Sequence, residues 1–451
     1  MPDVDRSRLA ALIERERRAY QNAHPRAEKL FASAGHLFGR VPMTWMGMWS
    51  GGFPLYLDRA SGNRVIDVDG HEYVDFALGD TGAMAGHSPR ATVQAVTERM
   101  DVLGGITTML PTEDAEWVGA ELTRRFGVPL WSFTLTATDA NRWAVRLARL
   151  ATGRPKILTF AYCYHGSVDE TFALQGPDEK AVARPGNVGA PVPLHVTTRV
   201  AEFNDLASVE AQLASGDVAA ILTEPALTNI GIVLPEPGFL EGLRALASRY
   251  GVLLMIDETH TFSAGPGGAT RLWSLDPDIL VIGKSIGGGI PCGAYGITTA
   301  VADMVQAHPE ADLVDVGGVG GTLAGNALSV TAMRASLEHV LTDAAFESMV
   351  HLATEFTAGV QQSIDRTGVG WSVTQLGARA EYRFVSPAPR DGSSSAAAED
   401  EQLDEFLHLY LANRGVLITP FHNMALMCPD TTLQDVTLHS RLFSEAVDEL
   451  V

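Results

Sequence analysis

The chain has 451 residues, of which 46% are hydrophobic and 19% charged, and its formal net charge is −21. A chain of this length can bury a large core and is expected to form more than one domain. The acidic balance argues against a protein that binds nucleic acid or lies on an anionic membrane surface, because both functions need clustered basic residues.

Lysine is scarce in this sequence. Only four of the 33 basic residues are lysines, and the rest are arginines. The search for a reactive amine is therefore limited to Lys29, Lys156, Lys180 and Lys284.

The three cysteines include no CxxC pair, so we expect neither a disulfide framework nor a zinc site, and no metal site is predicted. The first twenty residues are charged throughout and do not resemble a signal peptide. The sequence has no run of 18 apolar residues that could span a membrane. These features predict a soluble cytoplasmic protein.

The N-terminal part combines one helix with an apolar segment. Residues 7–34 predict a single amphipathic helix capped by Ser7. Residues 35–53, GHLFGRVPMTWMGMWSGGF, have neither helical nor strand periodicity and predict an apolar loop. Lining a pocket and packing in a core or an interface are both open for this loop. Residues 54–76 then predict short strands joined by glycine turns.

A different pattern begins near residue 88. Helical stretches alternate with the short apolar runs WSFTL, KILTF, AAILT, GVLLMID and DILVIG, which predicts an α/β domain with a mainly parallel sheet. After residue 327 a long helix leads into a smaller α/β region, in which residues 387–401 predict a low-complexity surface loop. We expect an N-terminal segment (1–87), a large domain (88–330) and a small C-terminal domain (331–451).

The carboxyl ends of the parallel strands are where functional residues should gather. Lys284 follows DILVIG and precedes three glycines. Low polarity at this position would favour the neutral, nucleophilic amine, although a lysine that only extends to solvent is the alternative. Asp257 ends the run LLMID, where a buried carboxylate needs a cationic partner unless it is solvated.

The remaining strand ends carry hydroxyl, aromatic and acidic groups. Thr136, Ala137 and Thr138 open a strong helical run, which suits an anion site or plain helix capping. Tyr164 and His165 follow KILTF, and Glu224 follows AAILT. An anion cradle, a flat aromatic ring, a carboxylate and a nucleophilic lysine form the set that pyridoxal 5′-phosphate requires.

These motifs also carry a family resemblance. From about residue 53 to the C-terminus, the chain resembles class III aminotransferases of the fold-type I pyridoxal phosphate enzymes. The similarity lies nearest the branch of glutamate-1-semialdehyde aminomutases and β-amino-acid transaminases. The motifs are DVDGHEYVDF, GHSP, TATDAN, YHG, TEP, IDE, GKSIGGG, GGTLAGN and RGVLITP. The resemblance implies a large domain with a mainly parallel seven-stranded sheet and a smaller α/β domain.

The resemblance also implies residue roles. Lys284 would form the Schiff base with the cofactor and move the proton, and Asp257 would pair with the pyridine nitrogen. Tyr164 would stack on the ring, and Thr322 would reach the phosphate bound by a neighbouring subunit. This implies a homodimer with shared active sites, or a larger assembly such as a tetramer. The other implied cofactor contacts are Thr136, Ala137, Thr138, His165, Glu224, Thr259 and His260.

The substrate pocket departs from the family pattern. Its expected lining residues are Arg40, Trp45, Met48, Trp49 and Arg379. The apolar and aromatic members favour a hydrophobic or bulky amine. Arg379 is a candidate carboxylate clamp, with a structural ion pair to Glu381 as the alternative.

The leading functional prediction is a transaminase. It would take an amino group from a primary amine or an ω- or β-amino acid and pass it to a keto acid such as pyruvate by ping-pong chemistry. The alternatives are a glutamate-1-semialdehyde-type aminomutase and a non-catalytic relative. No nucleic-acid or membrane partner is expected.

Overall fold

The computed structural model describes residues 4–308 and 318–451, which form two compact units. Unit 1 contains the chain up to Pro89 together with Glu347–Ala388 and Ala398–Val451, and unit 2 contains Arg90–Phe346 and Pro389–Ala397. Unit 2 extends to Phe346 because α10 (Ala327–His339) packs against α3 (Arg90–Glu98) and α4 (Glu113–Phe126). None of the helices in the described part of the chain is both long and apolar enough to cross a membrane.

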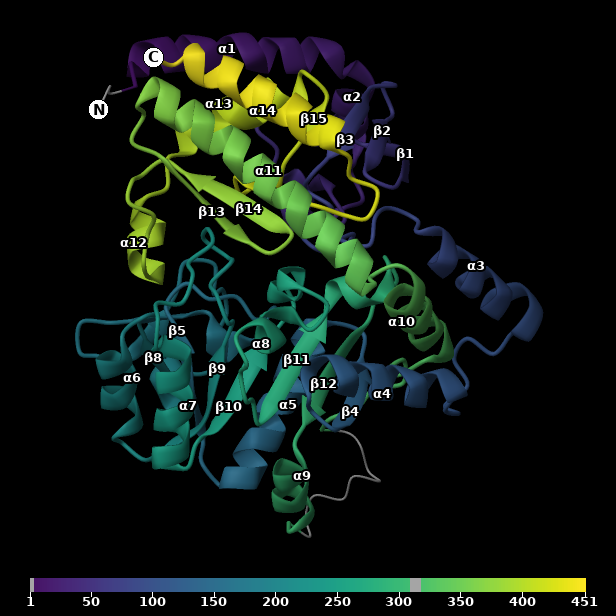
Figure 1. Ribbon diagram of the computed structural model, residues 1–451, viewed down its shortest axis with the longest axis vertical. Helices are drawn as coiled ribbons and strands as arrows, with labels where there is room; N and C mark the ends of the chain where they lie inside the picture. The colour runs from purple at the N-terminus through teal and green to yellow at the C-terminus, as the bar shows by residue number, and fades with distance from the viewer. Residues whose placement is uncertain (1–3, 309–317) are drawn as a thin grey trace. The chain divides into compact units, whose positions relative to one another are not determined.

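Unit 2 is built on a seven-stranded sheet with the order β4-β12-β11-β10-β9-β5-β8 (Figure 1). Only β12 runs antiparallel to its neighbours, so the mainly parallel seven-stranded sheet is confirmed. Five of the strands are the apolar runs identified in the sequence, whereas β8 and β12 were not predicted. The strands are β4 (Leu130–Thr134), β5 (Lys156–Phe160), β8 (Thr198–Ala201), β9 (Val218–Thr223), β10 (Leu253–Asp257), β11 (Ile279–Gly283) and β12 (Gly293–Ile297).

Helices cover both faces of this sheet, which explains why its central strands are apolar throughout. In β10, Leu254 and Ile256 join the core that includes α6 (Leu206–Leu213) and α7 (Phe239–Tyr250). The alternate residues Leu253 and Met255 join the core on the other face, with α5 (Ala137–Thr152) and α9 (Thr299–Gln306). Successive side chains of a strand point to opposite faces, so each strand is buried from both sides.

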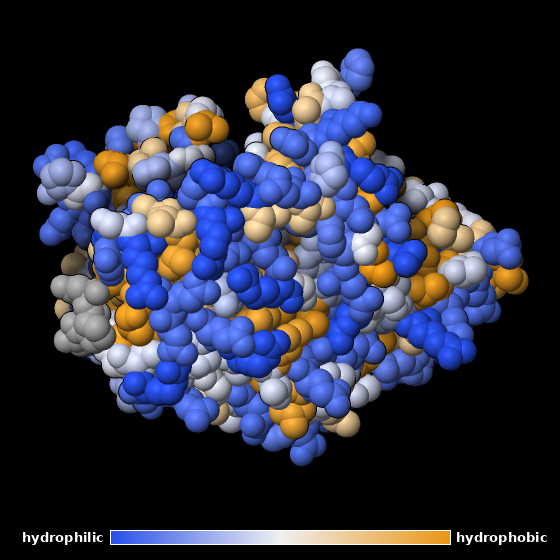
Figure 2. Space-filling view, turned by 90° about the horizontal axis from the view of Figure 1, so that it is seen from above, coloured by the Kyte–Doolittle hydropathy of each residue, from blue (hydrophilic) through white to orange (hydrophobic). Residues whose placement is uncertain are grey.

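Unit 1 contains two small sheets and the helices packed around them. One sheet has the order β1-β2-β3-β15 and the other β13-β14-β16. Helix α1 packs against α13, and α13 against α14 (Figure 1). Figure 2 shows mostly hydrophilic residues on the face seen from above, with smaller hydrophobic patches among them. The elements are α1 (Arg6–Ala23), α2 (Pro25–Ser33), β1 (Leu57–Ser61), β2 (Arg64–Asp67), β3 (Glu72–Asp75), α11 (Asp343–Thr367), β13 (Ser372–Leu376), β14 (Arg379–Arg383), α13 (Glu401–Ala412), β15 (Val416–Leu417), β16 (Met424–Leu426) and α14 (Leu433–Asp448).

The N-terminal helix differs from its prediction as a single helix over residues 7–34. It is two helices, α1 and α2, separated at His24. Pro25 causes the break, because proline disfavours the helical conformation of the residue before it, and His24 has φ −121° and ψ 51°. The cap also differs: the Asp5 carboxylate, not Ser7, accepts hydrogen bonds from the first backbone N–H groups of α1.

The predicted surface loop over residues 387–401 is also more ordered than expected. It contains α12 (Gly392–Ala397), whose Ser395 is buried and donates a hydrogen bond to the Ile230 carbonyl at 2.5 Å. This contact explains why Pro389–Ala397 belongs to unit 2.

Other short elements of unit 2 are β6 (Ala173–Gln175), β7 (Ala181–Ala183) and α8 (Gly268–Leu272).

Candidate active site

Lys284 stands at the carboxyl end of β11, beside the end of β10. It has φ +52°, in the left-handed region that residues with a Cβ rarely adopt. Strain of this kind persists where the surrounding structure fixes a functional side chain. The Lys284 Nζ lies 2.8 Å from the His260 Nε2, and the lysine is half-buried. At this distance the amine and the imidazole nitrogen can share a hydrogen bond.

Asp257 ends β10 and is 3% exposed. Its carboxylate lies 2.9 Å from the His165 Nδ1, and it accepts hydrogen bonds from the Asn141 amide at 2.8 Å and the Thr259 backbone N–H at 3.0 Å. Burial alone would raise the pKa of Asp257, but the hydrogen bond and charge of His165, with the other donors, lower it below its usual value. Asp257 is thus a buried anion held in a fixed orientation.

His165 is the charge partner of this carboxylate. Burial would lower the pKa of His165, but the neighbouring Cys163 and the Asp257 carboxylate raise it to about 10. The imidazole is fully buried at the end of β5, so the pair is shielded from solvent. The arrangement keeps a negative carboxylate at the sheet edge without leaving it unpaired.

The N-terminus of α5 forms an anion cradle at the same edge. The Thr136 hydroxyl caps the helix by accepting from the Asp139 N–H at 3.1 Å. The N–H groups of Ala137 and Thr138 are among those that a helix leaves without an internal acceptor. Gly166 has φ +73°, and a Cβ at this position would lie 2.1 Å from the Thr138 hydroxyl oxygen. The glycine therefore keeps room for the threonine hydroxyl beside the open N–H groups.

Glu224 positions Tyr164, the aromatic residue of the predicted cofactor site. Its carboxylate accepts from the Tyr164 backbone N–H at 3.2 Å and from the Thr228 hydroxyl. Burial raises the pKa of Glu224, which is 2% exposed. The Tyr164 ring is half-buried and packs edge-on against Phe172, with the ring centroids 5.9 Å apart.

The structure brings most of the predicted cofactor residues together at the carboxyl ends of β4, β5, β9, β10 and β11. Thr322 lies apart from them, exposed in a turn ahead of α10. The position of Thr322 at a neighbouring subunit's phosphate stays a prediction.

The predicted substrate residues all belong to unit 1. Arg40 lies over the Phe31 ring at 5.7 Å, and Arg379 is 1% exposed and donates to the Thr81 hydroxyl at 2.5 Å. Trp45 packs against Phe421, Trp49 packs against Tyr73, Ala412 and Leu417, and Met48 is exposed. Roles for these residues in substrate binding stay predictions, and so does an ion pair of Arg379 with Glu381.

Sequence reasoning overlooked Asn141 and Cys163. Asn141 is fully buried and binds Asp257, and Cys163 lies beside His165. A signal for Asn141 was present: it is a polar residue within the apolar stripe that α5 turns toward the sheet. For Cys163 the sequence offered no comparable signal, because buried cysteine is common in cores.

Comparisons with known proteins agree with this geometry. The chain matches the sequence model of the class-III aminotransferase family over residues 46–445. It is 33% identical over 401 residues to a glutamate-1-semialdehyde 2,1-aminomutase of Roseiflexus castenholzii, covering 88% of this chain and 90% of that protein.

Solved structures extend the likeness. A glutamate-1-semialdehyde aminomutase from Pseudomonas aeruginosa PAO1 is 47% identical with a TM-score of 0.95, covering 99% of this chain and all of that one. A lysine-to-alanine variant of such an enzyme from the same organism, 46% identical, was solved in complex with PMP. An omega-transaminase from Sphaerobacter thermophilus is 28% identical with a TM-score of 0.85, covering 95% of this chain and 99% of that one.

The residues of this chain fit pyridoxal 5′-phosphate. The cradle at α5 suits a phosphate, the buried Asp257 carboxylate suits a protonated ring nitrogen, and Lys284 supplies an amine. Gly166 lets the segment after β5 approach the start of α5 closely, and the Ser167 N–H donates to the Thr138 hydroxyl at 3.2 Å, so two segments meet at the cradle, which a plain helix cap would not need. The chain therefore belongs to the class-III aminotransferase family and is a pyridoxal phosphate-dependent enzyme.

Proposed function

We propose that this enzyme moves an amino group within a single small substrate, as a glutamate-1-semialdehyde-type aminomutase. The observation that carries this proposal is the similarity to aminomutase structures over 99% of the chain, at 46–47% identity. Transaminase structures are more distant, at 28% and 25% identity. The aminomutase, an alternative in the predictions from the sequence, therefore replaces the transaminase as the leading proposal.

The side chains of the site have defined tasks in this proposal. Bound pyridoxal phosphate supplies an aldehyde carbon and a ring that accepts electrons when a neighbouring carbon loses its proton. Lys284 holds and moves that proton at Nζ, and the His260 imidazole, 2.8 Å away, orients the amine through a hydrogen bond. Asp257 keeps the ring nitrogen charged, and the open N–H groups of α5 hold the phosphate.

One feature favours the transaminase as a second candidate. The segment around η2 (Thr44–Gly47) exposes Met43, Met46 and Met48, each by about half of its surface. Apolar, adaptable methionines suit a bulky amine better than a small polar aldehyde. The two candidates differ in one requirement: a transaminase needs a separate keto-acid acceptor, whereas an aminomutase needs none.

Turnover without an acceptor tests the proposal. The enzyme loaded with pyridoxamine phosphate is given glutamate-1-semialdehyde alone, and formation of the isomer with its amino group on the terminal carbon is followed. We expect turnover without any keto acid, and none in Lys284→Ala. Turnover only when an amine and pyruvate are both supplied would establish the transaminase instead.

We also propose that the enzyme works as a homodimer. The segment from η3 (Arg99–Leu103) to Leu110 exposes a cluster of large apolar side chains. Val102 is 72% exposed and Met109 77% exposed, and Met100, Leu103 and Leu110 are each more than half exposed. Contiguous exposed apolar residues mark protein contacts. A second copy covering this cluster, called here the 99–110 cluster, is consistent with the predicted role of Thr322.

A further inference from the structure

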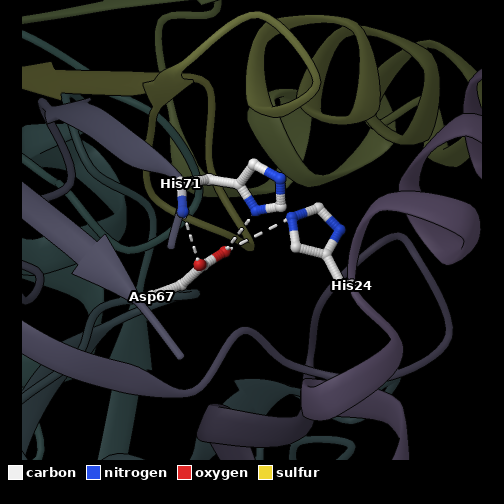
Figure 3. Close-up of side chains that lie close together, drawn as sticks. All are labelled: His24, Asp67 and His71. Atoms are coloured by element: carbon white, nitrogen blue, oxygen red, sulfur yellow. Dashed lines mark hydrogen bonds and ion pairs between the residues drawn. The ribbon is translucent and has the colours of Figure 1, made fainter. Parts of the chain in front are cut away.

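A group of metal-binding side chains lies in unit 1, outside the site described above. His24, Asp67 and His71 place one ligand atom each within 4.8 Å of the others. Figure 3 shows the two imidazoles turned toward the Asp67 carboxylate. Two of the three residues are almost completely buried, at 2% exposure for the His24 side chain and 1% for Asp67, whereas the His71 side chain is 43% exposed.

The backbone brings these residues together from distant positions in the chain. Pro25 breaks the helix at His24 and so directs this residue away from the regular course of α1. Asp67 ends β2, and His71 lies in the turn that leads to β3. Asp69 of this turn accepts hydrogen bonds from the Arg26 and Ala27 N–H groups at 2.8 and 3.0 Å. Asp69 therefore fastens the turn to the start of α2, which fixes the distance between His24 and Asp67.

The imidazole of His24 has the orientation of a metal ligand. Its Nδ1 lies 2.6 Å from the Tyr20 carbonyl oxygen, which can only accept, so Nδ1 carries the proton. The lone pair of Nε2 is then on the side of the Tyr73 hydroxyl, at 2.8 Å, and of the Asp67 oxygen, at 3.4 Å. A histidine that binds a metal commonly donates its other ring N–H to a backbone carbonyl in this way, which fixes the tautomer.

The His24 imidazole and the Asp67 carboxylate share one hydroxyl donor, that of Tyr73. The Nε2 of His24 lies 2.8 Å from the Tyr73 hydroxyl, which lies 2.9 Å from the Asp67 carboxylate, and Nε2 and the carboxylate are 3.4 Å apart. The single phenol proton can fill only one of these contacts. A cation at the meeting point of the lone pairs would resolve the conflict.

Two of the three distances between ligand atoms match a tetrahedral ion, and the third pair, the two histidine nitrogens, lies within 4.8 Å. Zinc bonds of about 2.0–2.2 Å to histidine and carboxylate place neighbouring ligand atoms about 3.4 Å apart in a tetrahedron. The His24 Nε2 and the His71 Nδ1 lie 3.4 and 3.2 Å from the same Asp67 oxygen. Two histidines and one carboxylate form a recognised zinc ligand set that leaves a fourth position for water, and the exposed side at His71 gives access.

We propose that His24, Asp67 and His71 bind one zinc ion, which joins the break between α1 and α2 to the turn between β2 and β3. His24 and Asp67 are 43 residues apart, which explains why no short sequence motif identifies the site. The site adds a binding function to unit 1 and is independent of the reaction proposed above.

Metal binding by the full-length, cofactor-loaded enzyme tests this proposal. The protein is prepared without a histidine tag, treated with a chelator and dialysed against zinc, and bound zinc is counted by elemental analysis. His71→Gln is the main variant, because His71 is the most exposed ligand and its loss should leave the fold intact. His351→Gln, an exposed histidine on α11, is the matched control.

We expect one zinc per chain in the wild type and in His351→Gln. For His71→Gln we expect the affinity for zinc to be at least about tenfold weaker than in the wild type. Loss of a residue that only hydrogen-bonds to a metal ligand already weakens metal affinity by about 10–100-fold. Cobalt in place of zinc should give the intense visible absorption of a tetrahedral ion, and this band should vanish in His71→Gln. Zinc should raise the midpoint of thermal unfolding of the wild type but not that of His71→Gln. No bound zinc in the wild type, or equal binding in His71→Gln, would overturn the proposal.

Discussion

Lys284 is the residue on which the chemistry depends most directly. Lys284→Arg keeps the positive charge, but a guanidinium does not lose its proton and cannot act as the amine or as the base. We expect turnover to fall by about 10²–10⁴-fold or more, the usual contribution of a positioned proton-transfer group. Lys29→Arg, in α2, is the matched control and should retain full activity. Similar rates for the two variants would refute the assignment of Lys284.

A second prediction at the residue scale concerns Asp404 and pH. Burial raises the pKa of Asp404 to about 6, although its hydrogen bond from Asn423 at 2.6 Å and the charge of Arg383 oppose the shift. The folded carboxyl thus holds its proton more tightly than the unfolded one. The stability that it contributes is greatest at acid pH and is lost as the pH rises toward 6 and above.

Asp404→Asn removes this dependence and keeps an oxygen that can accept from Asn423. The stability of the wild type relative to the variant should fall by on the order of 1 kcal/mol between pH 5.5 and 7.5. The measurement is the difference in thermal midpoint between the two proteins at each pH. A difference that does not change with pH would show that Asp404 titrates normally.

At the scale of elements, the anion cradle at the N-terminus of α5 depends on Gly166, which follows the next strand, β5. Gly166→Ala introduces a Cβ 2.1 Å from the Thr138 hydroxyl oxygen and also strains a backbone with φ +73°. Gly127→Ala is the matched control, because Gly127 has φ +78° and no atom within 4 Å of the added Cβ. Both variants should lose about 1–3 kcal/mol of stability through backbone strain.

Only Gly166→Ala should also release the cofactor. We expect its pyridoxal phosphate to dissociate at least tenfold more readily than that of Gly127→Ala, measured by equilibrium dialysis. Equal cofactor retention in both variants would mean that the Thr138 hydroxyl does not contribute to the cradle.

The elements that the sequence predicted are those with strong local patterns. The runs KILTF, AAILT, LLMID and ILVIG are buried on both faces of the sheet and are therefore predominantly apolar. β12, GAYGI, contains two glycines, and β8, TRVA, is an edge strand with charged and polar residues, so neither has such a pattern. The break at Pro25 was predictable from the proline alone.

The site was predictable for a related reason. Parallel strands end at one edge, so the residues after each apolar run meet there, as Asp257 and Lys284 do. Asn141 is a polar residue in the apolar stripe of α5, which signals burial but does not identify its partner, Asp257. Arg379 is buried beside Thr81 through contacts between distant segments, which no local pattern records.

At the scale of the whole molecule, charge and apolar surface act in opposite directions. Two copies of a chain with net charge −21 repel each other, and salt screens this repulsion over about 10 Å at 0.1 M ionic strength. A homodimer therefore needs apolar contact to form. The 99–110 cluster offers this contact, because each Å² of apolar surface removed from water contributes about 25 cal/mol.

Disrupting the 99–110 cluster should separate the subunits. Val102→Asp combined with Leu110→Asp adds two charges to each side of the contact and removes part of its apolar surface. Val188→Asp is the control, because it alters an 88% exposed valine elsewhere in unit 2. Light scattering should report a dimer for the wild type and for Val188→Asp, and a monomer for the double variant. Because repulsion between the acidic chains is screened by salt, any residual association of the double variant should strengthen as the salt concentration rises. A monomeric wild type would overturn the homodimer itself. A double variant that stays dimeric at low salt would place the contact elsewhere, since neither the charge nor the lost apolar area could then be at the interface.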